Sequence, residues 1–176
     1  GSILRIRVNG APGPAEYTSP LDNPFANGPA TSRPEVYMTG FETLRIAFDA
    51  GPDLLYIADV GENRLEELNV VPRSAAGSNF GWNVFEGSYC RRVDCTAALD
   101  TTVLPVLEYS HDVGAAIIGG YVYRGERAPA LTGRFVFADF EGLSEALAWL
   151  GGVAGDVREH FPLGSLFQDS DNPGWI

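Results

Sequence analysis

The stretch LYIADV at Leu55–Val60 is followed 80 residues later by FVFADF at Phe135–Phe140. Each stretch is apolar and aromatic, and each ends in Ala-Asp before a neighbouring Gly and Glu. Runs of this kind predict β-strands, and their recurrence predicts a repeated antiparallel unit. Groups of four short strands, about 40 to 50 residues each, are typical of the blades of a β-propeller. The repeat therefore predicts an all-β fold.

Further strand-like runs are separated by turn residues along the whole chain. A β-hairpin is predicted where Leu44–Asp49 and Leu54–Asp59 flank Ala50-Gly51-Pro52-Asp53. The other expected strands are Ile3–Val8, Leu68–Val71, Leu104–Tyr109, Ile117–Tyr123, Arg134–Asp139 and Ala146–Leu150. Residues 10–34 are expected to form a long surface loop, and Leu143–Leu150 fits either a strand or a helix.

These runs predict a single partial propeller domain over residues 1–176, with two full blades and flanking strands. The expected division is a blade remnant at 1–40, blades at 41–109 and 110–160, and the start of another blade at 161–176. A propeller needs about four to eight blades to close, so the segment is incomplete as a propeller. Because Gly1–Ile6 reads as a strand and not as a signal peptide, we expect the chain to be cut from a longer protein.

The charge of the chain limits its partners. The formal net charge is -11, and all 12 basic residues are arginine. Such an acidic chain repels nucleic acid and anionic lipid, and no apolar run approaches the roughly 20 residues of a membrane-spanning helix. The charge suits Ca²⁺, which takes oxygen ligands, although solubility alone also accounts for it.

The two cysteines, Cys90 and Cys95, lie in one loop with four residues between them. Their spacing allows a disulfide that closes a very small loop, and such pairs are commoner in oxidising compartments. The pair is a poor zinc site, because the sequence offers no second cysteine pair and no nearby histidine.

The densest cluster of polar residues follows the first of the two repeated strands, at Asp59–Asn69. Gly61 permits a positive φ and exposes neighbouring carbonyls, which are ligands for hard cations. Glu66 and Glu67 are adjacent, so in an extended strand their side chains point to opposite faces. The alternative is a charged hairpin end in solvent, which is the usual place of surface carboxylates.

Three further blocks carry distinctive residues. Gly77–Gly87 places aromatic residues between glycines, which indicates a packed turn that covers the edge of a core. Glu108–His111 precedes a glycine-rich turn, and Gly119–Gly125 is a strand that ends in Arg124. A single histidine at a strand end is more often structural than catalytic, and most strand-end arginines are solvated.

Taken together and in order, these blocks resemble the soluble quinoprotein sugar dehydrogenases. That family includes glucose, sorbosone and aldose dehydrogenases that use pyrroloquinoline quinone, together with hedgehog-interacting-protein-like ectodomains. The blocks that carry the resemblance are Ile3–Ile6, Asp22–Phe25, Gly40 with Ile46–Asp49, Leu55–Gly61, Glu66–Asn69, Asn79–Trp82 with Glu86-Gly87, Glu108–His111, Gly119–Gly125 and Asp139-Phe140. The resemblance implies a six-bladed β-propeller that holds the quinone and Ca²⁺ above its central channel. It also implies oxidation of a sugar C1 hydroxyl by hydride transfer to the quinone, with a histidine as base.

The resemblance also assigns site residues. It implies that the Gly61 and Glu62 carbonyls hold the catalytic Ca²⁺ and that Glu66 lies at the quinone. It implies that Arg124 pairs with the quinone carboxylates, a pairing that charge-assisted hydrogen bonds favour. A second, structural Ca²⁺ is implied at Glu67, with main-chain oxygens near Phe80 and Glu86. The family is periplasmic or secreted, which adds to the expectation of a Cys90–Cys95 disulfide.

The chain departs from the family pattern at three points, of which the first two bear on function and the third, the loss of both members of one disulfide, does not. The family's catalytic histidine precedes the Ile3 strand, so this chain supplies no catalytic residue, and His111 belongs to a different motif. Gly40 is followed by Phe41-Glu42-Thr43, one residue short and with a carboxylate where the family usually has an Arg-Asn pair. Glu141-Gly142-Leu143-Ser144 and Ala115-Ala116 replace the two family segments that carry cysteines.

The expected function is therefore a piece of a sugar dehydrogenase that is inactive alone. The whole protein is expected to take a small-molecule sugar, and this chain to pack against the rest of its propeller. The alternatives are a non-catalytic, hedgehog-interacting-protein-like binding module, which Glu42 favours, and a structural fragment without a ligand.

Overall fold

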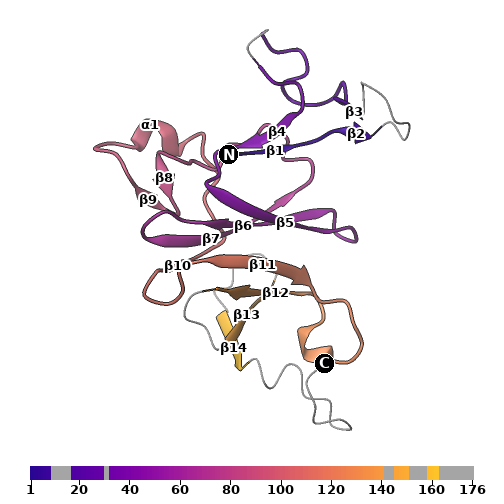
Figure 1. Ribbon diagram of the computed structural model, residues 1–176, viewed down its shortest axis with the longest axis vertical. Helices are drawn as coiled ribbons and strands as arrows, with labels where there is room; N and C mark the ends of the chain where they lie inside the picture. The colour runs from indigo at the N-terminus through magenta and orange to yellow at the C-terminus, as the bar shows by residue number, and fades with distance from the viewer. Residues whose placement is uncertain (9–16, 30–31, 141–144, 151–157, 163–176) are drawn as a thin grey trace.

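The computed structural model describes residues 1–8, 17–29, 32–140, 145–150 and 158–162. Two antiparallel sheets of four strands form most of this part of the chain (Figure 1). The first sheet has the order β10-β7-β6-β5, with β5 at Thr43–Asp49, β6 at Leu54–Val60, β7 at Leu65–Pro72 and β10 at Leu107–Ser110. The second has the order β11-β12-β13-β14, with β11 at Ile117–Val122, β12 at Arg134–Asp139, β13 at Glu145–Leu150 and β14 at Arg158–Pro162.

Three two-stranded pairs accompany these sheets. They are β1 (Ser2–Leu4) with β4 (Val36–Thr39), β2 (Arg7–Val8) with β3 (Tyr17–Thr18), and β8 (Phe85–Glu86) with β9 (Tyr89–Cys90). The helices of the described chain are one α-turn, α1 at Thr96–Leu99, and one 3-10 turn at Pro129–Leu131. No helix of the described residues is long and apolar enough to cross a membrane. The expectation of an all-β fold is confirmed.

The two large sheets lie face to face, one below the other in Figure 1. A shared core of buried side chains fills the space between them, and Tyr56 of β6 stacks on Phe135 of β12 with ring centroids 4.7 Å apart. Its members are Ala47, Tyr56, Ala58, Leu68, Leu107, Tyr109, Ile117, Phe135 and Phe137. Gly119 of β11 permits this close approach, because a Cβ on it would lie 3.1 Å from the Cβ of Arg45.

The other face of the first sheet packs against β1 and β4. A second core cluster lies there, in which Phe41 stacks on Phe80 at 4.6 Å. Its buried members are Ile3, Tyr37, Met38, Phe41, Ile57, Val71 and Phe80. Residues on β6 and β7 therefore alternate between two buried environments, which is why β6 is almost entirely apolar and why even the polar residues Glu66, Glu67 and Asn69 of β7 are buried.

Most predicted strands are present with shifted ends. Arg134–Asp139 is reproduced as predicted, and the ambiguous Leu143–Leu150 stretch contains strand β13. The prediction of one strand at Ile3–Val8 is wrong, because β1 pairs with β4 whereas β2 pairs with β3. The predicted loop at 10–34 contains β3, while residues 9–16 and 30–31 lie outside the described residues.

Strand β7 begins at Leu65, three residues before the predicted start at Leu68. Both carboxylates of this segment are buried, and Glu67 accepts the N–H of Gly87 between β8 and β9, while Glu66 accepts the N–H of Ile117 in the second sheet. The predicted disulfide is confirmed, because Cys90 and Cys95 are bonded. The division into blades at residues 41–109 and 110–160 stays a prediction.

Replacing Phe135 by alanine tests the inter-sheet core. Phe135 is 1% exposed, so we expect the substitution to lower the unfolding free energy by about 3 to 5 kcal/mol, and Phe135→Leu by less. Chemical denaturation measures the change. Tyr121→Ala is the matched control, because Tyr121 lies in the same sheet and is 79% exposed. Equal losses for Phe135 and Tyr121 would show that the two sheets do not share this core.

Candidate functional site

The turn that joins β6 to β7 is organised by a buried carboxylate from another segment. Glu86 Oε1 accepts hydrogen bonds from the backbone N–H groups of Asn63, Arg64 and Leu65 at 2.5 to 3.2 Å. Gly61 opens this turn, where a Cβ would lie 2.0 Å from the Leu65 carbonyl oxygen and 2.9 Å from Glu86 Oε1. Close approach, and not the positive φ suggested by the sequence, therefore requires glycine here.

Glu86 remains ionised although it is buried. Burial acts to raise its pKa, but the three N–H donors outweigh it, and Arg91 helps to hold the pKa of Glu86 below the ordinary value. Arg91 Nε lies 3.7 Å from Glu86 Oε2, and the same guanidinium is paired with Glu62. The Glu86 carboxylate is thus engaged with this turn and with Arg91.

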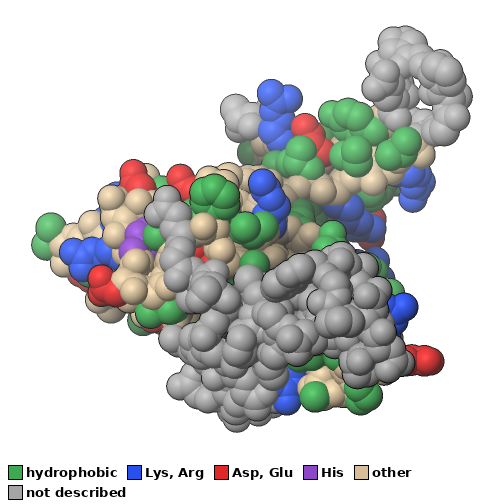
Figure 2. Space-filling view, turned by 60° about the horizontal axis from the view of Figure 1, so that its bottom comes forward, with side chains coloured by type: hydrophobic (Ala, Val, Ile, Leu, Met, Phe, Trp, Pro, Cys, Tyr) green, Lys and Arg blue, Asp and Glu red, His purple; other side chains and the backbone are tan. Residues whose placement is uncertain are grey.

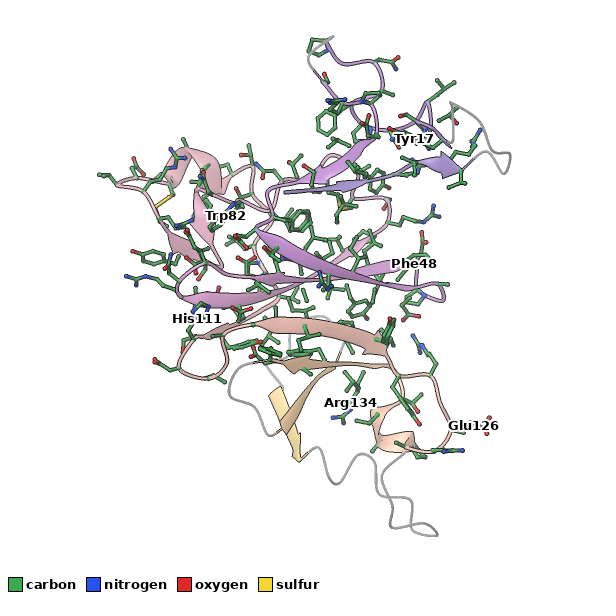
Figure 3. All side chains as sticks on the ribbon, in the orientation of Figure 1. Tyr17, Phe48, Trp82, His111, Glu126 and Arg134 are labelled. Carbon is green, nitrogen blue, oxygen red and sulfur yellow. A yellow bond between two sulfur atoms is a disulfide. The ribbon has the colours of Figure 1, made fainter. Side chains whose placement is uncertain are left out.

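Glu66 connects the two large sheets. Its side chain is fully buried, Oε1 lies 2.8 Å from His111 Nε2, and Oε2 accepts a hydrogen bond from Ile117 N at 2.9 Å. Burial raises the pKa of Glu66, and the nearby Asp139 charge adds to this effect, whereas Ile117 and His111 oppose it. Figure 3 shows His111 at the end of the sheets where β10 meets the next loop.

Asp139 completes this buried polar cluster between the sheets. Tyr109 donates its hydroxyl to Asp139 Oδ2 at 2.7 Å, and Ala116 N donates to the same carboxylate. Burial and the bond to Asp139 raise the pKa of Tyr109. The sequence did point to Asp139, since it ends the second copy of the repeat, but it gave no sign of the bond to Tyr109.

Glu67 lies on the opposite face of β7, as the alternation of a strand predicts. Its Oε1 accepts a hydrogen bond from Gly87 N, and Oε2 lies 3.4 Å from Asn69 Nδ2. Strand register places Asp59 of β6 and Glu108 of β10 directly opposite Glu67 on either side. Like charges in such cross-strand positions are destabilising.

The electrostatic consequence is that the pKa values of two carboxyl groups, Glu67 and Asp59, are raised. Burial raises the pKa of Glu67 to about 7, and the charges of Asp59 and Glu108 contribute. Burial likewise raises the pKa of Asp59 to about 6, although the backbone N–H groups of Glu42 and Thr43 bond its carboxylate. Both carboxylates therefore hold a proton more tightly than an exposed Asp or Glu.

Asn69 offers an unused oxygen beside Glu67. The residue is 1% exposed, and its Oδ1 has no hydrogen-bond partner among the described residues. A buried acceptor without a donor is costly, and a hard cation satisfies such an oxygen together with a carboxylate. We call the side of the first sheet that carries Glu67 and Asn69 the Glu67 face, and its oxygens are of the kind that fits Ca²⁺. Within the described chain, no three His, Cys, Asp or Glu side chains are grouped to hold a metal, so main-chain or amide oxygens have to complete the ligand set.

Comparison with known proteins identifies the family. The model of the glucose/sorbosone dehydrogenase family matches residues 1–149. The chain belongs to this family. It is similar to the HIPL1 protein of Arabidopsis thaliana, with 32% identity over 165 residues, which are 81% of this chain and 23% of that protein. The HIPL2 protein of the same plant is 31% identical over 161 residues, which are 79% of this chain and 23% of that protein.

Solved structures of sugar dehydrogenases share the fold. The PQQ-bound aldose sugar dehydrogenase of Streptomyces coelicolor aligns with a TM-score of 0.58 and 23% identity, over 92% of this chain and 39% of that one. A glucose dehydrogenase aligns with a TM-score of 0.67 and 24% identity, over 86% of this chain and 44% of that one. The chain is thus a partial β-propeller, and it spans about a quarter of the curated relatives.

The structure brings together most, but not all, of the residues that the family resemblance assigns. Gly61, Glu62 and Glu66 lie in or beside the turn between β6 and β7, and the Gly87 bond brings Glu67 to the Glu86 turn. The ring of Phe80 stacks on Phe41 in the second core, and the assignment of main-chain oxygens near Phe80 to Ca²⁺ stays a prediction.

Arg124 lies at the opposite end of the sheets, where it pairs with Asp49. Asp49 ends β5, six residues beyond Thr43, and Thr43 pairs with Val60 beside the Gly61 turn. Strand residues rise about 3.3 Å each, so Arg124 is roughly 20 Å from that turn. Phe48, labelled in Figure 3, marks this distant end.

These positions do not fit pyrroloquinoline quinone, which is a polyanion. Glu66 is buried against His111 and Ile117, and Arg124 is engaged by Asp49. Figure 2 shows acidic, basic and histidine side chains intermixed at the left end of the molecule, without a broad basic patch on that face. Glu66 and Arg124, which the family pattern gives to the quinone, are therefore engaged within this chain.

The raised pKa values predict how stability changes with pH. Glu67 has a folded pKa of about 7 against an ordinary value of 4.5, so the folded protein keeps a proton that the unfolded chain releases. Without Ca²⁺, we expect the contribution of Glu67 to the unfolding free energy to be complete below about pH 4.5 and to fall by roughly 3 kcal/mol as the pH rises through about 7. Asp59, with a folded pKa of about 6, acts in the same direction. Denaturant unfolding with a chelator measures this slope.

Glu67→Gln removes one of these titrating groups and should flatten the slope. Glu126→Gln is the matched control, because Glu126 is exposed at the far end of the molecule (Figure 3). An unfolding free energy that rises between pH 5 and pH 8 would contradict the electrostatics described for the Glu67 face.

Proposed function

We propose that the chain is a two-blade segment of a six-bladed propeller whose whole protein oxidises the C1 hydroxyl of an aldose or sorbosone-type sugar. Family membership over residues 1–149 carries this proposal, together with two successive four-stranded sheets packed face to face. In the whole protein, pyrroloquinoline quinone accepts the hydride, and groups outside this chain hold the quinone and supply the catalytic base.

The contribution of this segment is structural and calcium-binding. Glu67, with an ordinary pKa of 4.5 raised to about 7, and the unpartnered Asn69 Oδ1 support a Ca²⁺ site on the first sheet. Main-chain oxygens near Phe80 and Glu86 are the further ligands that the family pattern offers. The Glu86 side chain is not part of this proposal, because it bonds the 63–65 turn.

A second candidate is a non-catalytic propeller of the kind that the HIPL relatives represent. The specific observation in its favour is the absence of cations for a quinone at the assigned positions. Glu42 stands where the family usually has an arginine, its N–H bonds Asp59, and Arg124 is engaged by Asp49.

We place the whole protein in the periplasm or outside the cell. The Cys90–Cys95 disulfide supports this location, since such bonds persist in oxidising compartments. The net charge of -11 supports a small-molecule sugar, and not a nucleic acid, as the partner of the whole protein.

The chain alone should not oxidise sugar. It supplies none of the groups that act as base, and its Glu66 and Arg124 are held by other residues. A dye-reduction assay with glucose, added quinone and Ca²⁺ measures turnover, and a rate above that of a protein-free blank would contradict the proposal.

The same assay on a protein that carries this chain within a complete propeller separates the two candidate functions. Saturable, quinone-dependent dye reduction supports the dehydrogenase. Absence of quinone binding in a direct titration of that protein supports the binding module.

Calcium should stabilise the chain through Glu67. A ligand present at 100 times its dissociation constant raises the unfolding free energy by about 2.7 kcal/mol, which corresponds to about 5 to 10 °C in melting temperature. We expect this shift with millimolar Ca²⁺ for the wild type and for Glu126→Gln, and not for Glu67→Gln. Thermal melting with Ca²⁺ and with a chelator measures it, and equal melting temperatures in all samples would refute the site.

A further inference from the structure

The Cys90–Cys95 loop lies directly against the turn that Glu86 organises. Cys90 ends strand β9, and the disulfide returns the chain to Cys95, immediately before α1. Four residues are enclosed, and Val93 at the tip is fully exposed. Apolar packing therefore does little to order the tip of the loop, whereas the disulfide constrains it covalently.

Arg91 is the residue through which the loop contacts the rest of the sheet. Its backbone N–H donates to the Val84 carbonyl at 2.9 Å, and its guanidinium lies over the Trp82 ring at 4.3 Å from the centroid. The same guanidinium pairs with Glu62 and approaches Glu86 Oε2 at 3.7 Å. With 24% of its side chain exposed, Arg91 is a largely desolvated cation between two carboxylates.

The two carboxylates are parts of one local unit. Glu62 is in the turn between β6 and β7, and Glu86 holds that turn by three backbone hydrogen bonds. A buried carboxylate that loses its cation becomes less stable in its charged, hydrogen-bonded position. The order of the turn therefore depends on where Arg91 is held.

We propose that the Cys90–Cys95 disulfide holds Arg91 against Glu62 and Glu86, so that the loop is a redox-controlled latch on the Gly61–Leu65 turn. Arg91 is a positioning residue in this scheme. A dithiol reductant breaks the S–S bond. Two electrons and two protons convert the cysteines to thiols, and the reductant becomes a disulfide.

Reduction frees the segment 91–94 without removing any core side chain. The lost constraint increases the number of conformations open to the loop, and the Arg91 contacts then have to offset that entropy unaided. The Glu86 bonds to the turn weaken as Arg91 leaves. The two core clusters contain neither Arg91 nor Cys90, so the effect stays local.

Hydrogen exchange at the amides of Asn63, Arg64 and Leu65 tests the latch, because these N–H groups bond Glu86. We expect exchange there to be about tenfold faster after reduction by dithiothreitol and in a Cys90→Ser/Cys95→Ser variant, with amides of β12 unchanged. Arg91→Met should reproduce this gain in the oxidised protein. Arg91→Lys, which keeps the charge, should restore most of the protection.

Two outcomes overturn the proposal. Unchanged exchange at 63–65 in the serine variant shows that the disulfide does not hold Arg91. An equal rise in β12 shows that the disulfide only stabilises the whole fold. The measurement uses neither sugar, quinone nor Ca²⁺, so its result is independent of the proposed function.

Discussion

Two adjacent carboxylates, Glu66 and Glu67, are withdrawn from water on opposite faces of strand β7. A strand offers no alternative, because neighbouring side chains must alternate faces. Glu66 is hydrogen-bonded to His111, which follows β10, and to Ile117 N of the second sheet, and so joins the two four-stranded sheets. Glu67 instead accepts the N–H of Gly87 in the turn between β8 and β9, and it lies opposite Asp59 and Glu108 on the neighbouring strands. The Glu66 face of β7 therefore connects the two sheets, whereas the Glu67 face places a carboxylate between two other carboxylates.

The repeated Ala-Asp pair has a physical explanation that the sequence alone did not supply. Asp59, the last residue but one of β6, accepts the backbone N–H groups of Glu42 and Thr43, where the chain enters β5. Asp139 ends β12 and accepts the N–H of Ala116, where the chain enters β11. In both sheets, an Asp near the end of one strand (β6 or β12) binds the backbone N–H groups at the beginning of the strand that precedes it in the chain (β5 or β11). The Ala-Asp pair therefore recurs because the same hydrogen-bonding arrangement is used in both sheets.

Strands and the all-β class were predictable because apolar alternation and turn residues are local properties. Strand β7 was predicted three residues short, because the burial of Glu66 depends on His111, 45 positions away. A long-range contact also involves Arg124, whose assignment to the quinone came from the family pattern alone and stays a prediction. Its partner Asp49 lies 75 positions earlier in the chain, and sequence spacing gives no access to that contact. The opposite faces of Glu66 and Glu67 were predicted correctly, since the period of a strand needs no tertiary information.

The net charge of -11 suggested a cation partner only in general terms, whereas the structure indicates which carboxylates already have an arginine partner. Glu62 and Glu86 have Arg91, Asp49 has Arg124, and Glu66 is hydrogen-bonded to His111 and Ile117 N. The charges of Asp59 and Glu108 raise the pKa of Glu67, and Asn69 Oδ1 beside it has no hydrogen-bond partner among the described residues. A polyanionic quinone would add negative charge beside Glu67, whereas a divalent cation would offset the charge of the carboxylates there. The charge distribution of this segment therefore favours binding a metal over contacting the redox cofactor itself.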